Sequence, residues 1–403
     1  MGVIEAKETA LSVPTTDNKI EVKKFHPADV GAIALAHGTN DSYFAIVPTI
    51  QPLLMEKLGL SITQAGLFTL FLQLPSILQP VIGHQADRRN LRWLVILAPS
   101  ISATVITLTG LAPTFGWVAL LMVMAGFSTA GFHAIAPVLA GSLSGKKLGR
   151  SMGLFMVGGE LGYGLGPLLA VWVTTALGLT GLPWLIGLGL ACSLMLYLRF
   201  KNLNTMHPQP EAMSVPLRTV LLRMRPLMLP IMGYIFITSF LAAYMINFLP
   251  TFLTSEGSTL VKAGAAFSLV QVTGTIGVLV SSWLSDHIGQ KVVIFTATLI
   301  IPIFALLFLY APPAWQMPML AGAGLLAFSP NPAFLVLIQR FFHQERSMAN
   351  GIYMAAGFVI RSLVVLLVGA LSDLFGMRPV FIASAWVAFL ALPMVLLLPG
   401  KDG

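Results

Sequence analysis

Residues 83–92 read Gly83-His84-Gln85-Ala86-Asp87-Arg88-Arg89-Asn90-Leu91-Arg92 and form a short basic stretch between two long apolar segments. The pattern Gly-x-x-x-Asp-Arg at its start returns 199 residues later as Ser-x-x-x-Asp-His at 282–287. The run Arg-Ser-Met-Gly at 150–153 likewise returns 196 residues later as Arg-Ser-Met-Ala at 346–349. Similarity at a nearly fixed spacing is the signature of a repeated architecture, so the sequence predicts a chain made of two similar halves.

The composition predicts a membrane protein. Charged residues make up 9% of the 403 residues, hydrophobic residues make up 56%, and the mean hydropathy is +0.86. A soluble domain carries about 25% charged residues, so a water-soluble enzyme and an ordinary nucleic-acid-binding domain are both excluded. The polar N-terminal tail lacks the apolar segment of a cleavable signal peptide, and the lone Cys192 excludes an intrachain disulfide. We therefore expect a polytopic protein that has the lipid bilayer as a partner.

Twelve segments have the roughly 20 mostly apolar residues that a membrane-spanning helix needs. The short alternating segments that are typical of a transmembrane β-barrel do not occur in the sequence. The sequence therefore predicts an all-α fold with 12 transmembrane helices in two six-helix bundles. The expected spans are 28–50, 64–86, 92–112, 115–140, 150–176, 182–200, 226–254, 260–286, 291–310, 314–342, 347–372 and 378–398.

Lys and Arg predict the orientation, because they concentrate in the cytoplasmic loops of membrane proteins. With the N-terminus in the cytoplasm, 19 of the 23 Lys and Arg residues fall on the cytoplasmic side, 3 fall outside, and Arg361 falls within a span. Topology thereby explains the net charge of +8, and no nucleic-acid partner is expected. Both termini are expected on the cytoplasmic side of an inner or plasma membrane. The expected divisions are a tail (1–27), a bundle (28–200), a linker (201–225), a second bundle (226–398) and a C-terminal tail (399–403).

The stretch at 83–92 resembles the signature loop of the major facilitator superfamily, Gly-x-x-x-Asp-Arg-x-Gly-Arg-Arg, from which it departs at Asn90. The resemblance extends over the whole chain. It implies two six-helix halves that rock around a central site, with the signature loops closing the cytoplasmic side. The alternative is that these charges serve topology alone. The gating residues that the resemblance implies here are Gly83, Asp87, Arg88 and, in the second copy, Asp286.

The glycines of the fifth predicted span resemble a second superfamily pattern, Gly-x8-Gly-x3-Gly-Pro, which is associated with proton-coupled exporters. The matching residues are Gly153, Gly162 and Gly166-Pro167, and Ala170-Val171 stand where the pattern usually ends in Gly-Gly. The resemblance implies a gating role for the four matching residues and favours efflux. Small residues four apart also let two helices approach closely, so helix packing is the alternative explanation.

Within the superfamily, the sequence is similar to the fosmidomycin-resistance-type exporters, most clearly over residues 30–170. It departs from them in the fourth span, where Ala134-Ile135 follow in place of an expected Pro-Glu pair. The resemblance implies export by alternating access. The similar stretches are His-Gly-Thr-Asn-Asp at 37–41, Leu-Gln-Pro-Val-Ile-Gly at 78–83, Phe-His at 132–133, Met-Val-Gly-Gly at 156–159 and Gly-Leu-Gly-Pro-Leu-Leu at 164–169.

Five ionisable side chains are expected inside the membrane, where an isolated charge costs about 2.5–3.5 kcal/mol or more. Asp41 and Glu160 are predicted proton carriers, because burial favours the neutral form of a carboxyl group and a nearby cation favours its charged form. Arg361 is predicted to bind an anionic group or to act as the counter-ion. His37 and His133 are predicted to relay protons or to contact substrate. The alternative is a static pair, Asp41–Arg361 or Glu160–His133, that holds helices together.

Neutral polar residues in the spans that the resemblance assigns to the central cavity are further candidates for binding an organic solute. Proline on both sides of Asn331 predicts a break in the tenth helix, where exposed backbone groups can line a cavity. For each of these residues, a role in helix packing is as good an explanation as a role in binding a solute. The candidates are Asn40, Tyr43, Tyr244, Asn247 and Asn331.

The sequence contains no metalloprotease, nucleophile-elbow or nucleotide-loop motif, so neither an enzyme, a cofactor nor a metal site is predicted. We predict a secondary active transporter that exports a small organic compound, such as a fosmidomycin-like antibiotic, in exchange for protons. Two alternatives remain open, namely an uptake symporter or facilitator for an organic anion or metabolite, and a membrane sensor without transport. A small-molecule substrate and protons are the expected ligands, and a monomer is the expected state.

Overall fold

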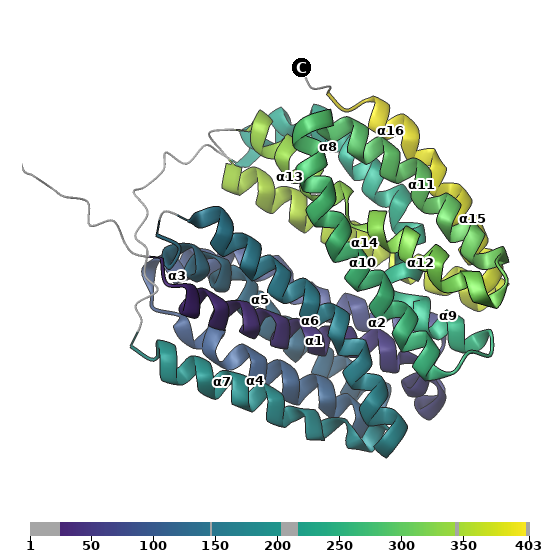
Figure 1. Cartoon of the computed structure of the whole chain (residues 1–403), viewed down its shortest axis with the longest axis horizontal. Coiled ribbons are helices and arrows are strands. Elements are labelled where there is room, and N and C mark those ends of the chain that lie inside the picture. The colour runs from purple at the N-terminus through teal and green to yellow at the C-terminus, as the bar shows by residue number, and fades with distance from the viewer. Residues whose placement is uncertain (1–24, 146, 203–216, 343–345, 400–403) are drawn as a thin grey trace, which may run out of the picture.

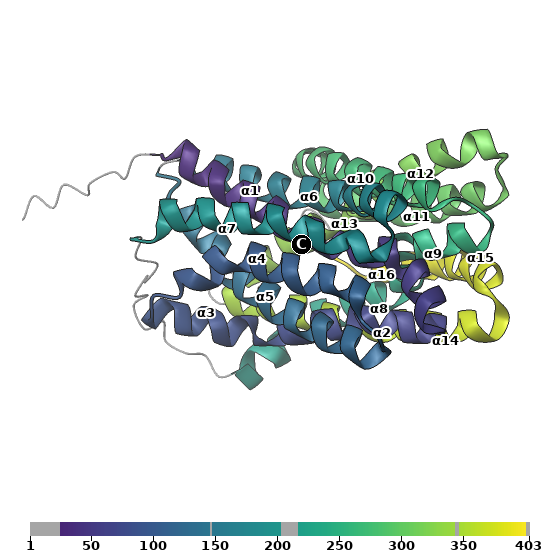
Figure 2. The ribbon, with the colours of Figure 1, turned by 90° about the horizontal axis from the view of Figure 1, so that it is seen from below.

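The computed structural model describes residues 25–145, 147–202, 217–342 and 346–399. Within these ranges the regular structure consists of helices, and no strand occurs. The helices run side by side along the long dimension of the molecule, with the N-terminal half (α1–α7) below the C-terminal half (α8–α16) in Figure 1. Figure 2, seen from below, shows the N-terminal half in front. This arrangement confirms the predicted all-α fold.

The described helices follow one another in twelve segments, which is consistent with the twelve predicted spans. Ten of them are long and apolar enough to cross a membrane, Ile62–Leu78 forms a shorter apolar helix, and the 32-residue α1 completes the set. In chain order the segments are α1 (Pro27–Leu58); α2, η1 and α3 (Ile62–Gln73, Leu74–Leu78, Gln79–Arg88); α4 and η2 (Arg92–Leu108, Thr109–Leu111); α5 (Phe115–Ser142); α6 (Leu148–Leu177); η3 and α7 (Leu179–Leu185, Ile186–Phe200); α8, η4 and α9 (Leu217–Ala242, Ala243–Phe248, Leu249–Ser255); α10 (Leu260–Ile288); α11 (Gln290–Tyr310); α12 and α13 (Pro313–Ala327, Pro330–Phe341); α14 (Arg346–Phe375); and α15, η5 and α16 (Met377–Ala388, Phe389–Ala391, Leu392–Leu396).

The first helix is longer than the predicted span 28–50. It continues through Pro48 and Pro52 and ends at Leu58, where Gly59 adopts a left-handed φ of 63° and its N–H donates to the carbonyl oxygen of Met55. A left-handed glycine directly after the last turn is a common helix end. The last turn of this helix contains polar residues, so the apolar pattern ends before the helix does. The predicted span was therefore too short.

The predicted linker is partly helical. Helix α8 begins at Leu217, so the last part of the expected linker 201–225 belongs to the seventh segment. Residues 203–216 lie outside the described residues. The division of the chain into tails, bundles and linker otherwise stays a prediction.

Two segments of the C-terminal half are interrupted. Helix α12 ends at Ala327 and α13 begins at Pro330, which is the break that the flanking prolines predict. Residues Ala243–Phe248 form a π-helix between α8 and α9. Single π-helical turns are rare and lie frequently at functional sites, and both interruptions border cavities described below.

Glycines allow α6 to lie directly against α1. A Cβ atom at Gly162 would clash with the backbone of Gly38, and one at Gly158 would clash with the backbone of Ala34. Gly166 faces the carbonyl oxygen of Ser42 in the same way. Small residues at this four-residue spacing permit close backbone approach in membrane helices. The glycine pattern of the fifth span therefore has a packing role, whatever its role in gating.

The close α1–α6 contact predicts that alanine substitution changes thermal stability in opposite directions at two glycines of α6. We expect Gly162→Ala to lower the melting temperature of the purified protein, because overpacking a close contact costs about 1–3 kcal/mol. Gly153→Ala is the matched control, since nothing lies within 4 Å of a Cβ atom there and alanine is the better helix former. Thermal unfolding in one detergent compares the two. Equal melting temperatures for both variants would contradict the close α1–α6 contact.

The two halves meet mainly at one end of the bundle. We call this end the distal face; it carries the turns at Gly59, Gly178 and Gly376. The opposite end, where α1 begins and α7 ends, is called the tail face. Helix pairs α6–α10, α2–α14 and α1–α9 make the contacts between halves, and in α6–α10 the Ser268 hydroxyl donates to the carbonyl oxygen of Gly164 at 2.5 Å.

Asp373, at the distal end of α14, ties the C-terminal half to the N-terminal half. Its carboxylate accepts hydrogen bonds from the backbone N–H groups of Ile62 at 2.8 Å and Thr63 at 2.9 Å, and from the Thr63 hydroxyl at 2.5 Å. These N–H groups open α2 and have no partner within the helix, so a carboxylate is favourable there. The Asp373 contact closes the distal face.

Candidate functional site

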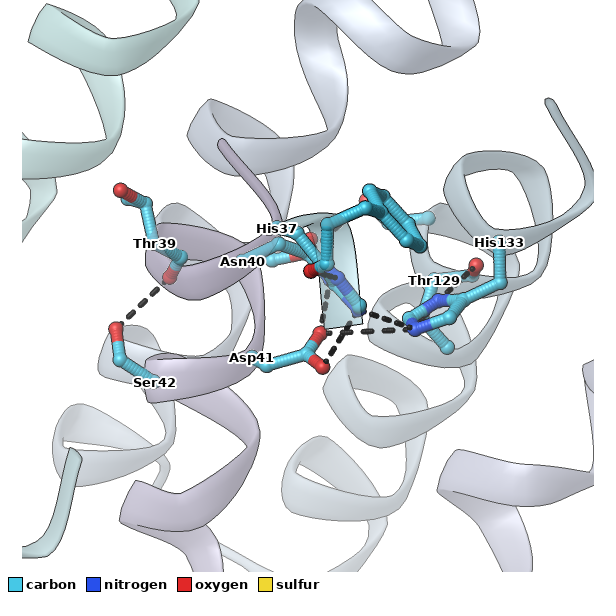
Figure 3. Close-up of polar contacts among 10 residues, drawn as sticks. His37, Thr39, Asn40, Asp41, Ser42, Thr129 and His133 are labelled. Atoms are coloured by element: carbon cyan, nitrogen blue, oxygen red, sulfur yellow. Dashed lines mark hydrogen bonds and ion pairs between the residues drawn. The ribbon is translucent and has the colours of Figure 1, made fainter. Parts of the chain in front are cut away.

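Three ionisable side chains converge inside the N-terminal half (Figure 3). His37 and Asp41 lie one turn apart on α1, and His133 projects toward them from α5. The Nε2 atom of His37 lies 3.1 Å from Asp41 Oδ2, and the Nε2 atom of His133 lies 3.7 Å from Asp41 Oδ1. The two Nε2 atoms are 3.3 Å apart. We call these three residues the His–Asp cluster.

A backbone carbonyl group fixes the tautomer of His37. Its Nδ1 atom lies 2.8 Å from the carbonyl oxygen of Phe155, and a carbonyl oxygen only accepts, so Nδ1 carries the hydrogen and Nε2 of the neutral ring presents a lone pair. The Nδ1 atom of His133 lies 2.9 Å from the Thr129 hydroxyl and 3.0 Å from the Thr129 carbonyl oxygen. Because a hydroxyl can donate to Nδ1, the neutral His133 ring can present an Nε2 hydrogen to Asp41 or to His37. The geometry thus places two imidazoles and one carboxylate within reach of a common proton.

The His37 ring fits because residue 159 has no side chain. A Cβ atom at Gly159 would collide with the imidazole of His37. On its other faces the ring stacks on Phe155, with centroids 4.0 Å apart, and contacts Phe132. His37 is consequently immobilised among three neighbours. The His133 side chain is 33% exposed and the His37 side chain 6% exposed, so His133 is the member of the cluster with access to the surroundings.

Asn40 supports the carboxylate. Its amide nitrogen donates to Asp41 Oδ1 at 3.0 Å, and its amide oxygen accepts from the Ser102 hydroxyl at 2.8 Å. Ser102 in turn pairs with Ser128 at 3.0 Å. Asn40 is fully buried and lines none of the cavities described below, so it orients Asp41. Its predicted contact with substrate stays a prediction.

Glu160 lies outside the hydrogen-bonded cluster. Among the described residues it forms no ion pair and no hydrogen bond, although it follows Gly159 directly in α6. The static pairs Glu160–His133 and Asp41–Arg361 that the sequence left open are likewise absent from this part of the chain. The carboxylate that the structure joins to the histidines is Asp41.

Two adjoining cavities lie farther into the molecule, and Arg361 of α14 lines both of them. One, of about 120 Å³, lies between the halves and is bordered by α1, α2, α6, α8, η4 and α14; Asn247 and Tyr163 line it. The other, of about 240 Å³, lies within the C-terminal half beside both interruptions, and Asn331 lines it. We call them the seam cavity and the inner cavity.

Of the neutral candidates, Asn247 and Asn331 face the cavities and the two tyrosines do not. The Thr69 hydroxyl donates to the Asn247 amide oxygen at 2.8 Å across the seam. Tyr43 is buried and donates to the carbonyl oxygen of Leu185 at 2.6 Å. Tyr244 is buried, bonds to Ser372 and to the carbonyl oxygen of Met377, and stacks on Phe381. Both tyrosines hold helices together here.

Comparison with known proteins identifies the family. The family model of the Major Facilitator Superfamily matches residues 33–364. The chain belongs to the major facilitator superfamily. It is 26% identical over 376 residues to the fosmidomycin resistance protein of Escherichia coli (strain K12), covering 91% of this chain and 92% of that protein. The predicted resemblance to superfamily transporters, and to the fosmidomycin resistance protein, is thereby confirmed, and an enzymatic activity is not indicated.

Solved superfamily structures share the fold. A bacterial homologue of the human lysosomal transporter Spinster, in an inward-facing and unoccupied conformation, superposes with a TM-score of 0.74 at 15% identity, over 92% of this chain and 96% of that one. The nucleoside transporter NupG superposes with a TM-score of 0.67 at 18% identity, over 91% and 99%. At these identities the likeness concerns the fold alone. Together with the family and the apolar helices, it establishes a multi-pass membrane transporter.

The gating residues that the superfamily patterns imply are only partly described. Gly83 lies in α3 and Gly153 in α6, each with open space beside it, and Gly162 and Gly166 pack on α1. The Pro167 carbonyl faces Gly264 of α10 across the seam. The side chains of Asp87, Arg88 and Asp286 lie outside the described residues. Their role in gating stays a prediction.

Sequence reasoning missed the residues that act through packing. Thr129 and Phe155 contact the His–Asp cluster, and no local pattern marks them. Gly159 belongs to the quoted stretch at 156–159, but no role was predicted for it. Gln51 and Gln73 line the seam cavity, and the sequence prediction did not include them. Their position within long apolar segments was a signal, because polar side chains inside a membrane are costly and commonly functional. The sequence predicts no metal. Among the described residues, the ligand-type atoms of the His–Asp cluster lie within 4.8 Å of one another, a spacing at which they could hold a metal ion.

Proposed function

We propose that this superfamily member is a proton-coupled exporter of a small organic compound, and that the His–Asp cluster carries the proton. The observation that supports this function is the convergence of His37, Asp41 and His133 at 3.1–3.7 Å in the membrane interior. A carboxylate with two imidazoles accepts a proton without leaving a net negative charge in the low-dielectric interior. The similarity to a fosmidomycin resistance protein supports export as the direction and a fosmidomycin-like antibiotic as a substrate.

The cycle follows from alternating access. When the cavities open to the outside, the substrate leaves the region around Arg361 and a proton enters through the partly exposed His133, to be shared with Asp41 and His37. When the cavities open to the cytoplasm, the proton is released there and the next substrate molecule binds, so protons move inward as the compound moves outward. Glu160, one residue from Gly159, is proposed as a second proton acceptor on this path. The superfamily gating residues Gly83, Asp87, Arg88 and Asp286 close the tail face during the cycle.

The distribution of Lys and Arg supports a cytoplasmic tail face in the inner or plasma membrane, with both termini inside. A monomer is proposed as the working unit. In that orientation the Asp373 contact closes the outer side, and the halves are arranged for access from the cytoplasm. Export then requires the Asp373 contact to break once in each cycle.

Everted membrane vesicles provide the test. We expect an acidic vesicle interior to drive uptake of labelled fosmidomycin, because the exported compound is exchanged for protons, and a protonophore to abolish this uptake. Vesicles with empty vector are the control. Uptake that appears only in right-side-out vesicles would establish the importer instead, and absence of flux in both orientations would leave a non-transporting sensor.

A further inference from the structure

The seam cavity and the inner cavity form one binding site with two compartments. They share Arg361 together with Ser239, Ala242 and Ile246, so a single ligand can occupy both. Their volumes, about 240 and 120 Å³, each fall below the roughly 300–1,000 Å³ that small-molecule sites occupy, so a ligand of ordinary size needs both compartments. The chemistry of the lining side chains then restricts what the ligand is.

Two glutamines of the seam cavity have unpartnered amide groups. Gln51 is 3% exposed, and its amide nitrogen is buried without a hydrogen-bond partner; the amide oxygen of Gln73 is buried without one as well. Leaving a buried donor or acceptor unpaired costs about 1–3 kcal/mol. A free donor on α1 and a free acceptor on α2 match a ligand group that has both an acceptor and a donor, such as a secondary amide or a hydroxamate.

Arg361 supplies a positive charge at the junction of the two compartments. Among the residues that the structure describes, no carboxylate pairs with it, and its side chain interacts with the neutral phenol of Tyr353 on its own helix. A guanidinium group in a bilayer is favourable only with a partner or with water, and its planar fork suits carboxylates and phosphates. The junction therefore fits an anionic group and disfavours a cation.

The inner cavity is mostly apolar. Ile235, Ile301, Phe328 and Phe334 line it, and its polar lining consists of Tyr234, Thr238, Ser239, Thr298, Asn331 and Arg361. A compound with only small polar groups would leave this compartment unfilled. An apolar chain on the anionic compound would fill it, with a gain of about 0.8 kcal/mol for each buried methylene group.

We propose that the transported compound is an amphipathic organic monoanion that carries an amide-like group, bound with its anion on Arg361, its amide on Gln51 and Gln73, and its apolar chain in the inner cavity. This inference rests on the proposed transport function for its physiological meaning, but binding itself does not require transport. N-octanoylglycine has all three elements, namely a carboxylate, a secondary amide and an apolar chain.

Equilibrium binding of N-octanoylglycine to the purified full chain in nanodiscs tests the proposal. We expect its affinity to exceed that of N-acetylglycine, which lacks the chain, octanoate, which lacks the amide, and octylamine, which is a cation, by about tenfold or more in each case. Equal affinity for the cation, or for the acetyl compound, would overturn the proposed site.

Variants separate the compartments. Arg361→Gln is expected to weaken binding of N-octanoylglycine by about tenfold or more, and Arg361→Lys to restore part of it. Gln51→Met is expected to weaken binding and, at the same time, to raise the melting temperature of the empty protein, because it removes an unpaired buried amide. A structural role for Gln51 predicts the reverse change in melting temperature and would overturn its assignment.

Thr251 offers a matched control. Its hydroxyl is also buried without a partner, but it lies in α9 and lines neither cavity. Thr251→Val is expected to raise the melting temperature without changing affinity for N-octanoylglycine.

If binding follows these expectations while a pH gradient fails to drive flux, the ligand class stands and the proposed proton coupling fails. If coupling is observed with fosmidomycin while N-octanoylglycine does not bind, the coupling stands and the ligand class fails.

Discussion

Replacing Asp41 with asparagine is expected to abolish proton-driven transport while the protein stays folded. Asparagine has the same shape, and its amide oxygen can still accept the hydrogen bond that Asn40 donates to the carboxylate. It does not exchange a proton, so the two imidazoles lose the group that balances their charge. We expect the rate driven by a pH gradient to fall at least about 100-fold, the range in which loss of a proton-transfer group acts.

Counterflow distinguishes loss of coupling from loss of structure. In proteoliposomes without a pH gradient, exchange of labelled for unlabelled substrate needs no net proton movement, and we expect Asp41→Asn to retain it. Asp29→Asn is the matched control, because Asp29 lies on the same helix but pairs with Arg199 at the tail face. Normal gradient-driven transport by Asp41→Asn would refute the assignment of the proton to the His–Asp cluster.

Replacing Asp373 with alanine is expected to open the distal face. The change removes three hydrogen bonds to α2 and leaves the first N–H groups of that helix to water. A loss of about 2 kcal/mol would shift the ratio of closed to open molecules roughly thirtyfold. Spin labels at the exposed positions Glu56 and Ala314, one on each half, are expected to report a population at longer distance.

A second carboxylate at the same end provides the control for this experiment. Glu256 pairs with Arg378 within the C-terminal half, so Glu256→Gln is expected to leave the distance distribution unchanged. If Asp373→Ala gives the distribution of the unmodified protein, the helix contacts alone close the distal face, and the carboxylate has no part in gating.

The pattern of apolar residues predicted most of the helices and their limits. Span limits such as 92–112 and 260–286 agree with the helices Arg92–Leu111 and Leu260–Ile288 within two residues. The agreement follows because a stretch of about twenty apolar residues matches the length of a helix that spans a bilayer. The end of α1 was missed, since Gly59 stops the helix by its backbone conformation and the apolar pattern had already ended. Local periodicity also contains no sign of the π-helical turn at Ala243–Phe248.

The candidate site was predictable only where residues are close in sequence. His37 and Asp41 are four apart on one helix, which places them together, whereas His133 joins them through the packing of α5 on α1. Glu160 was an equally good candidate by composition, but α6 turns it out of the hydrogen-bonded cluster. The importance of Gln51 and Gln73 depends on the absence of a partner, which no single sequence reveals.

The steric fit between His37 and Gly159 restricts how this protein can have diverged. Because any side chain at residue 159 occupies the space of the imidazole, the two positions form a coupled pair. Relatives that keep a histidine at position 37 should keep glycine at 159, and those that lose the histidine should accept larger residues there. Covariation between these two positions would therefore mark which members of the superfamily share this proton site.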